Sequence, residues 1–308
     1  MQTFKDIELK IGNTPLVEVP NIAKVEGLLA KLLIKLEGCN PAGSIKDRAA
    51  LFMINDAEES GQIKQGATII EATSGNTGIG LAAIGKARGY NVILTMPDTM
   101  SRERIDLLQG YGAQVVLTDG NLGMQGAIDK ANEINKSTPN SVIIGQFSNP
   151  ANAKAHYRTT GPEIWAQTEG KVDIFVAGVG SGGTISGTGK FLKERKNSVK
   201  IIAVEPEKSP MISKGFSGAH KIQGIGANFI PNNYNATVVD AVMTASDEDA
   251  FHYTRLMAKL ENVLVGISTG AALSVAIRLA KQPENQGKTI VVISADTGER
   301  YLSTGLFE

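Results

Sequence analysis

Residues 172–184 read VDIFVAGVGSGGT, an apolar run that passes directly into a glycine-rich loop. The run 172–177 is typical of a buried strand, and the residues after the loop have the pattern of a helix that extends to about Glu194. Such a unit brings backbone N–H groups and a helix N-terminus to one point, which suits a phosphate group. The loop also satisfies the pattern GxGxxG, and Glu205 ends the next predicted strand, so a nicotinamide-binding Rossmann domain is an alternative interpretation.

Similar apolar runs, rich in β-branched residues, alternate with segments of helical periodicity along the rest of the chain. They predict strands at 32–36, 68–71, 92–96, 114–118, 142–146, 200–204 and 289–293. Gly61 and Gly89 are expected to end helices over residues 44–60 and 79–88, respectively, in the left-handed conformation. Ser44 and Ser246 are each followed three residues later by aspartate, which resembles the capping box at a helix start. This alternation indicates an α/β protein with mainly parallel sheets.

Composition narrows the classes of partner. The 308 residues are enough for two domains, and 31 lysine and arginine residues balance 31 aspartate and glutamate residues. No basic cluster interleaved with aromatic residues occurs, so we expect neither a nucleic-acid nor a membrane partner. The first residues lack the pattern of a signal peptide, and no apolar run approaches the roughly 18 residues of a membrane span. We therefore expect a cytoplasmic protein.

Metal and disulfide chemistry are also not expected. The single cysteine, Cys39, excludes an intrachain disulfide and is interpreted as a small buried residue without a catalytic role. The three histidines, His156, His220 and His252, lack the spacing of metal ligands. No metal site is therefore predicted.

A second loop that follows a predicted strand, residues 73–78, reads TSGNTG. It offers hydroxyl, amide and backbone N–H donors at the expected start of a helix, without a charged side chain. This set of donors suits a carboxylate ligand. Taken alone, the loop would be interpreted as a tight turn in which Asn76 adopts an unusual backbone angle.

A third segment, residues 40–48, reads NPAGSIKDR and places Lys46 in the first turn of a predicted helix. A cation is poorly placed at the positive end of a helix dipole. Lys46 is therefore a candidate for a neutral amine or an imine, the states in which a lysine acts as a covalent catalyst. The alternative is a solvated lysine paired with Asp47 or another neighbour.

Together, six segments in one order and register resemble the cysteine synthase, or O-acetylserine sulfhydrylase, family over essentially the whole chain. They are residues 13–16 (NTPL), 40–48, 73–78, 180–184 (GSGGT), 220–226 (HKIQGIG) and 298–304 (GERYLST). The resemblance implies an α/β enzyme of fold type II, similar to the tryptophan synthase β-subunit, with two domains that are each a twisted, mainly parallel sheet flanked by helices. We expect residues 1–43 and 151–308 to form the larger, cofactor-binding domain, and residues 44–150 the smaller, mobile, substrate-binding domain.

The resemblance also implies a cofactor, pyridoxal 5'-phosphate, and a role for each site residue. Lys46 would be the catalytic residue, which forms a Schiff base with the cofactor and later moves protons at the α-carbon. The other cofactor-binding residues would be Asn76 beside the ring hydroxyl, Ser268 facing the pyridine nitrogen, and Gly180, Ser181, Gly182, Gly183 and Thr184 around the phosphate. The substrate-binding residues would be Thr73, Ser74, Gly75, Asn76, Thr77, Gln146, Gly224 and Asn228.

The implied reaction is the synthesis of cysteine, in which sulfide replaces the acetate of O-acetylserine. Asn228 departs from the family pattern, because cysteine synthases usually carry glycine at this position and cystathionine β-synthase-like relatives carry an acid. A polar side chain there could favour serine or cysteine as the first substrate. An enzyme that forms cystathionine or lanthionine, or that releases sulfide from cysteine, is therefore the alternative. Residues 293–297 and 215–218 also differ from the commoner family sequences, which leaves the acceptor open.

The expected partners are an amino-acid substrate and either sulfide or a thiol. The resemblance implies a homodimer and a possible complex with serine acetyltransferase, whose C-terminal tail docks in the active-site cleft of family members. A purely binding role is disfavoured because Lys46 is intact. The nicotinamide alternative leaves Lys46, the 73–78 loop and Ser268 without a role.

Overall fold

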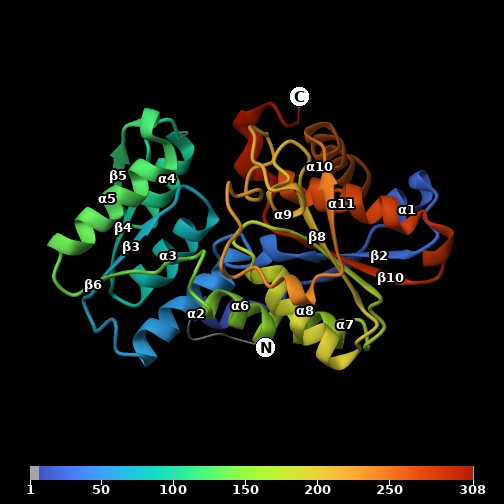
Figure 1. The fold of residues 1–308 in the computed structure, drawn as a ribbon, viewed down its shortest axis with the longest axis horizontal. Helices are drawn as coiled ribbons and strands as arrows, with labels where there is room; N and C mark the ends of the chain where they lie inside the picture. The colour runs from blue at the N-terminus through green and yellow to red at the C-terminus, as the bar shows by residue number, and fades with distance from the viewer. Residues whose placement is uncertain (1–6, 101, 308) are drawn as a thin grey trace. The chain divides into compact units, whose positions relative to one another are not determined.

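The computed structural model describes residues 7–100 and 102–307, which form two compact units, each with its own β-sheet (Figure 1). Unit 1 consists of residues 7–11 together with residues 46–152. Unit 2 consists of residues 12–45 together with residues 153–307. Each unit is thus assembled from segments that are far apart in the sequence.

The sheet of unit 2 has six strands among the described residues, in the order β1-β2-β10-β7-β8-β9. Their bounds are β1 Leu16–Glu18, β2 Lys31–Leu36, β7 Ile174–Gly178, β8 Lys200–Pro206, β9 Ala241–Ala245 and β10 Thr289–Ser294. Strand β1 is antiparallel to β2, and the other neighbouring pairs are parallel. The predicted strands of this sheet are confirmed, whereas the edge strands β1 and β9 were not predicted. Strand β1 has only three residues, whereas β9 has five, as many as the predicted strand β5 (Gln114–Thr118), and both β1 and β9 are only partly buried.

Helices cover both faces of this sheet (Figure 1). On one face lie α1 (Pro20–Glu26), α10 (Asp247–Glu261) and α11 (Ile267–Ala280), which pack on a core that includes Ile34, Val176 and Val292. On the other lie α7 (Gly161–Gln167) and α8 (Gly183–Arg195), which pack on Phe175 and Val291. Because successive strand residues point to opposite faces, a sheet covered on both sides requires continuous apolar strands. This requirement explains the runs seen in the sequence.

The sheet of unit 1 is parallel throughout its described strands, in the order β5-β4-β3-β6. The strands are β3 Thr68–Ala72, β4 Asn91–Pro97, β5 Gln114–Thr118 and β6 Ser141–Ile143. The helices of this unit are α2 Lys46–Glu59, α3 Asn76–Ala87, α4 Arg102–Gly110 and α5 Gly123–Ser137. Two further α-helices of the described residues are α6 Ala151–Ala155 and α9 Met211–Lys214, and a π-helical segment lies at His156–Thr160.

Helices α3 and α5 lie on opposite faces of the unit 1 sheet. A Cβ added to Gly85 of α3 would lie 2.8 Å from a Val92 methyl carbon and 3.4 Å from Ile69. Thr95, which points to the other face of β4, donates its hydroxyl hydrogen to the Ala127 carbonyl of α5 at 2.7 Å. Alternation along the strands therefore assigns Ile69 and its neighbours on the same side to the α3 face.

Several predicted boundaries are confirmed and three are wrong. Gly61 and Gly89 have φ angles of 73° and 79°, as expected for left-handed helix ends, and Ser246 accepts the Asp249 N–H at 3.0 Å as the N-cap of α10. The predicted helix start at Ser44 is wrong, because α2 begins at Lys46 and Ser44 forms an isolated β-bridge with Asp296. The helix expected from 79 begins earlier, at residue 76. The strand predicted at 142–146 ends at residue 143, since the chain turns where Gly145 has a φ of 72°.

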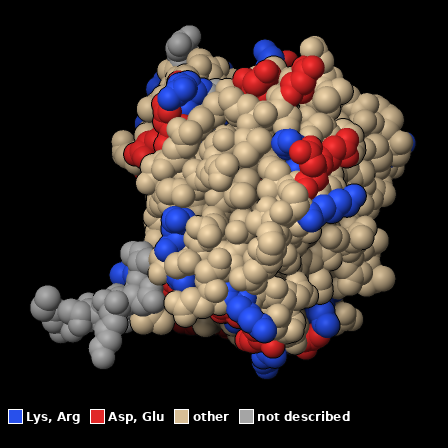
Figure 2. All heavy atoms as spheres, turned by 90° about the vertical axis from the view of Figure 1, so that its left-hand side faces the viewer, with Lys and Arg blue, Asp and Glu red and all other residues tan. Residues whose placement is uncertain are grey.

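Charged side chains of both signs share the face shown in Figure 2, where lysine and arginine lie among aspartate and glutamate. Within the described ranges, no helix is both long enough and apolar enough to cross a membrane. The same residues contain no group of three or more His, Cys, Asp or Glu side chains that could hold a metal ion.

Candidate active site

Lys46 lies at the start of α2, at a point where two helices of unit 1 come very close together. A Cβ added to Gly80 of α3 would lie 3.1 Å from the Ala50 Cβ and 3.2 Å from the Lys46 carbonyl oxygen. Glycine at position 80 therefore permits the first turn of α2 to pack directly against α3. Because α3 begins at Asn76, this packing holds the half-buried Lys46 near the 73–78 loop.

The 73–78 loop connects the end of β3 to the first turn of α3. Gly75 is the N-cap residue, with φ −107° and ψ −162°, and its N–H donates to the Thr73 hydroxyl at 3.2 Å. Within the described chain, no side chain caps this helix start through a hydrogen bond. The positive end of the α3 dipole therefore faces the loop, which favours an anionic ligand.

Gln146 is joined to the end of this loop by a direct hydrogen bond. The Thr77 hydroxyl donates to the Gln146 Oε1 at 2.6 Å, and both residues are buried. The Gln146 carbonyl accepts from the Asn152 side-chain amide at 2.8 Å. Segments 69 residues apart in the sequence thus meet in unit 1.

Glu71, which the sequence did not single out, supports the Gln146 segment from the strand β3. Its carboxylate accepts the N–H groups of Gly145 at 2.8 Å and Gln146 at 3.1 Å. Burial raises the pKa of the Glu71 carboxyl, although these hydrogen bonds and one from the Gln146 side chain act in the opposite direction. The only signal in the sequence was an acid inside an otherwise apolar strand.

In unit 2, the glycine-rich loop connects β7 to α8 in the way that the sequence predicted. Gly182 is the N-cap of α8 with φ 83°, and a Cβ at this position would lie 2.7 Å from the Tyr234 backbone nitrogen. A Cβ on Gly180 would lie 2.4 Å from the Gly224 carbonyl oxygen. Both positions therefore require glycine, and the loop exposes its backbone to a ligand instead of side chains.

The start of α8 is a suitable site for a phosphate group. Among the described residues, no side chain caps this helix N-terminus, whose first residues are Gly183 and Thr184. Ser181 is 4% exposed, and the Thr184 hydroxyl lies 3.3 Å from His156 Nε2. His156 itself is fully buried and its Nδ1 lies 3.0 Å from the Thr160 hydroxyl. Nothing in the sequence indicated this contact between His156 and the loop.

Ser268 lies near the same loop, at the second position of α11. A Cβ added to Gly224 would lie 3.9 Å from the Ser268 Oγ, and the Gly226 N–H donates to the Val179 carbonyl at 3.0 Å. Segment 224–226 therefore lies beside both the glycine-rich loop and Ser268. Asn228, a few residues further on, has an exposed side chain.

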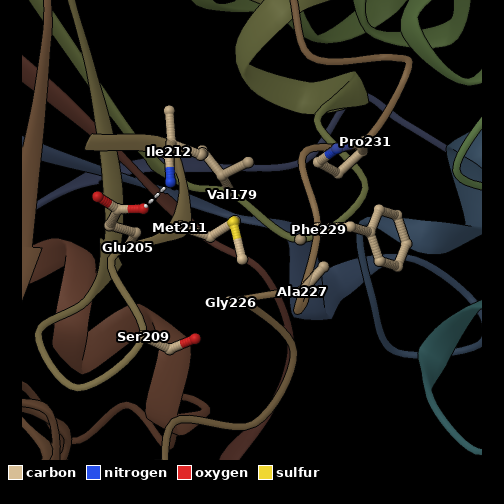
Figure 3. A pocket seen from close by; sticks show the side chains of 10 residues that line it. Val179, Glu205, Ser209, Met211, Ile212, Gly226, Ala227, Phe229 and Pro231 are labelled. Carbon is tan, nitrogen blue, oxygen red and sulfur yellow. Dashed lines mark hydrogen bonds between the residues drawn. The ribbon is translucent and has the colours of Figure 1, made fainter. Parts of the chain in front are cut away.

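A small cavity beside Gly180 bears on the nicotinamide alternative (Figure 3). Its wall includes Glu205, which is 2% exposed and whose carboxylate accepts the N–H groups of Ile212 at 2.8 Å and Ser213 at 3.0 Å. Glu205 thus caps α9 and is occupied, whereas a dinucleotide site would need it for a ribose hydroxyl. The cavity, of about 10 Å³, has room for about one water molecule. These observations disfavour the nicotinamide interpretation.

The predicted site residues thus form two groups, one in each unit. Unit 1 contains the first group: Lys46, Thr73, Ser74, Gly75, Asn76, Thr77 and Gln146. Unit 2 contains the second: Gly180, Ser181, Gly182, Gly183, Thr184, Gly224, Asn228 and Ser268. The first group offers an amine and donors for a carboxylate, and the second offers a backbone cradle for a phosphate and a buried hydroxyl.

Comparisons with known proteins identify the family of the chain. A family model described as pyridoxal-phosphate dependent enzyme matches residues 7–296. A cysteine synthase of Staphylococcus aureus is 50% identical over 298 residues, which cover 96% of this chain and 95% of the relative. Among solved structures, a cysteine synthase of Entamoeba histolytica is 43% identical with a TM-score of 0.96, covering 99% of this chain and 91% of that chain. A hydrogen sulfide-producing enzyme of Fusobacterium nucleatum is 45% identical with a TM-score of 0.94, covering 98% of this chain and 99% of that chain.

Proposed function

Because the chain belongs to the family of pyridoxal-phosphate-dependent enzymes, we propose that it is a cysteine synthase, which replaces the acetate of O-acetylserine with sulfide to give L-cysteine. The observation that carries this proposal is the packing of the first turn of α2, with Lys46, against α3, which follows the 73–78 loop. A covalent catalyst and a carboxylate site are thereby held on the same unit.

The residues of both groups fit the parts of pyridoxal 5'-phosphate. The uncapped start of α8 and the glycine cradle at Gly180 and Gly182 suit its phosphate group. The Ser268 hydroxyl, 6% exposed, would face the pyridine nitrogen, and Asn76 would lie beside the ring hydroxyl. A hydroxyl does not hold a proton on that nitrogen as a carboxylate would, so this environment favours loss of a β-substituent over prolonged carbanion chemistry.

When bound, the cofactor supplies an aldehyde that binds amines covalently and a ring that withdraws electrons from the attached amino acid. Lys46 would hold the cofactor between turnovers and, as a neutral amine, move the proton at the substrate α-carbon. Its place in the first turn of α2 supports this role, because the helix dipole disfavours a cation there.

The 73–77 segment and Gln146 would bind the substrate carboxylate through hydroxyl, amide and N–H donors at the start of α3. This anchor would direct the β-carbon of the amino acid toward the incoming sulfide. The bond from that carbon to the acetate oxygen breaks and a carbon–sulfur bond forms, while the α-proton is removed and returned by Lys46.

Asn228 supports a second candidate within the same chemistry, in which serine or cysteine is the first substrate. Its exposed amide provides a hydrogen-bonding group where the family usually has glycine. The Fusobacterium nucleatum relative is described as producing hydrogen sulfide. Replacing Asn228→Gly should raise the kcat/KM for O-acetylserine relative to serine and cysteine, and unchanged ratios would remove Asn228 as a determinant of substrate choice.

The proposal includes the assembly and location that the family resemblance implies. We propose a cytoplasmic homodimer in which residues 44–150 form the smaller, mobile domain that closes over the substrate, and residues 1–43 and 151–308 the larger, cofactor-binding domain. The two compact units differ from these bounds chiefly in that residues 7–11 belong to unit 1. Serine acetyltransferase is a candidate partner. Light scattering of the purified holoenzyme, with and without that acetyltransferase, tests the dimer and the complex.

Lys46→Ala tests the catalytic assignment, with Lys86→Ala as the control because Lys86 is an exposed lysine of the adjacent helix α3. We expect Lys46→Ala to abolish cysteine formation and the visible absorbance of the covalently held cofactor, near roughly 410 nm, while the fold is retained. The Lys86→Ala enzyme should match the wild type in both. Undiminished turnover by the Lys46→Ala enzyme would disprove the assignment.

A further inference from the structure

Glu71 is a buried acid in a strand whose neighbouring residues are fully apolar. It is 3% exposed in β3, and Ile69 and Ile70 beside it are fully buried. The strand alternation directs Glu71 to the same face as Ile69, the face that α3 covers. A carboxylate at such a depth is unfavourable unless its oxygens accept several hydrogen bonds.

Those hydrogen bonds go to a single target, the turn that carries Gln146. The two Glu71 oxygens accept the N–H groups of Gly145 at 2.8 Å and Gln146 at 3.1 Å, and the Gln146 side chain also hydrogen-bonds to Glu71. Gly145 has a φ of 72°, so this turn leaves the sheet geometry at the residue that Glu71 holds. The carboxylate replaces the ladder partners that the turn has lost.

The oxygen of the Gln146 side-chain amide contacts Thr77 of the 73–78 loop. The Gln146 Oε1 accepts the Thr77 hydroxyl at 2.6 Å, so the nitrogen of the amide must be the group that donates to Glu71. Glu71, Gln146 and Thr77 thus form a continuous hydrogen-bonded row from the strand β3 to the first turn of α3. The row fixes which way the Gln146 amide is turned.

We propose that Glu71 is a positioning residue which, as an ionised carboxylate, holds Gln146 and Thr77 in the arrangement that binds the α-carboxylate of the amino-acid substrate. This inference rests on the proposed function, because it assigns a task to the residues of that substrate site. Glu71 does not itself touch the substrate in this scheme and acts through Gln146.

Glu71→Gln in the holoenzyme tests the proposal, because the new amide would place a donor against the backbone N–H donors of Gly145 and Gln146. We expect the KM for O-acetylserine to rise about tenfold, with kcat changed less than threefold. Glu71→Asp, which keeps the charge on a shorter side chain, should recover part of the affinity. Glu58→Gln is the matched control, since Glu58 is an acid of unit 1 that accepts from Arg88 and Tyr90 and should leave KM unchanged.

A double-mutant cycle separates positioning from a purely structural effect. In a Gln146→Ala background, Glu71→Gln should raise KM by less than twofold, because the group through which Glu71 acts is already absent. An equal rise in both backgrounds, an unchanged KM in Glu71→Gln, or an aspartate variant no better than the glutamine variant would each overturn the proposal.

Hydrogen exchange supplies a measurement that does not depend on turnover. The peptide that covers residues 144–150 should exchange at least about tenfold faster in Glu71→Gln than in the wild type, and at the wild-type rate in Glu58→Gln. If wild-type enzyme forms no cysteine, the proposed function fails, but faster exchange still shows that Glu71 holds the turn. If cysteine forms and exchange is unchanged in Glu71→Gln, the role of Glu71 fails alone.

Discussion

Gly180→Ala tests whether the glycine-rich loop depends on a tertiary contact and not only on its own backbone freedom. The added Cβ would lie 2.4 Å from the Gly224 carbonyl oxygen, whereas real Cβ atoms stay beyond 3.0 Å. The carbonyl or the loop must therefore move by at least about 0.6 Å. The move is opposed by the hydrogen bond from the Gly226 N–H to the Val179 carbonyl, which ties the same two segments together at 3.0 Å.

The expected penalty follows from forcing one extra carbon into packed backbone, which costs about 1–3 kcal/mol. For a chain of this size, each kcal/mol corresponds to a Tm lower by about 2–4 °C. The same displacement moves the start of the loop that would hold the cofactor phosphate, so pyridoxal phosphate should also bind more weakly to Gly180→Ala. Thermal unfolding of the apoenzyme and an absorbance titration with pyridoxal phosphate measure the two effects separately.

Gly110→Ala is the matched control for this substitution. Gly110 is the last residue of α4, and a Cβ added there meets no atom within 4 Å. Alanine is a better helix former than glycine, so this variant should keep or slightly raise the Tm and bind the cofactor as the wild type does. A Gly180→Ala enzyme with the Tm and cofactor affinity of the Gly110→Ala enzyme would refute the steric argument.

Three further outcomes are expected from residues of unit 2. Ser246→Ala removes the N-cap of α10 and should lower the free energy of unfolding by about 1 kcal/mol in urea titrations, and an unchanged midpoint would contradict the capping role. Burial alone would raise the pKa of Asp247, but the Lys208 ammonium and a backbone N–H hold it below its usual value, so its stabilisation is present above the unfolded-state pKa and is lost as pH falls through the folded-state pKa. Asp247→Asn should therefore lower the Tm at pH 7, and its difference from the wild type should shrink as the pH falls from about 4 through the folded-state pKa, whereas a difference independent of pH would exclude this linkage. Lys35→Met leaves Glu163 without the buried ammonium that lies 2.7 Å from its carboxylate, and should lower the free energy of unfolding by about 3–5 kcal/mol. Adding Glu163→Leu should restore much of that loss, and a double variant no more stable than Lys35→Met would contradict the coupling of the pair.

The sequence alone was sufficient for the fold class, because the determinants of an α/β fold are local and repeated. Strands covered on both faces must be apolar throughout, and such runs identified the inner strands of both sheets. The glycines that end helices could also be predicted, because few residues other than glycine adopt the left-handed conformation found at Gly61. The edge strand β1 escaped prediction because it has only three residues and is partly buried, so burial imposes little pattern on it. Length and burial do not explain why β9 escaped prediction, since the predicted edge strand β5 has the same length and is no more buried.

The sequence predicted only part of the candidate site. Motifs near Lys46 and in the 73–78 and 180–184 loops could be identified because each belongs to a single strand–loop–helix unit. Glu71 and His156 were not predicted, since their roles depend on partners distant in the sequence: Glu71 contacts a turn 74 residues away, and His156 contacts Thr184, 28 residues away. No local pattern encodes such contacts.

Tertiary contacts determine at which positions glycine is required and which polar side chains are already hydrogen-bonded. The sequence showed that Gly180 and Gly80 lie in flexible or helical segments, but only packing places Gly224 against the first and the Lys46 turn against the second. Packing also places the start of α9 against Glu205, whose carboxylate accepts two N–H groups of that helix. The acid that a dinucleotide site would need for a ribose hydroxyl is therefore already hydrogen-bonded within the protein. Local conformation follows from the backbone preferences of the residues and from the spacing of apolar side chains along the chain. Contacts between segments that are distant in the sequence follow instead from close packing of side chains in the folded protein, which the sequence pattern does not show.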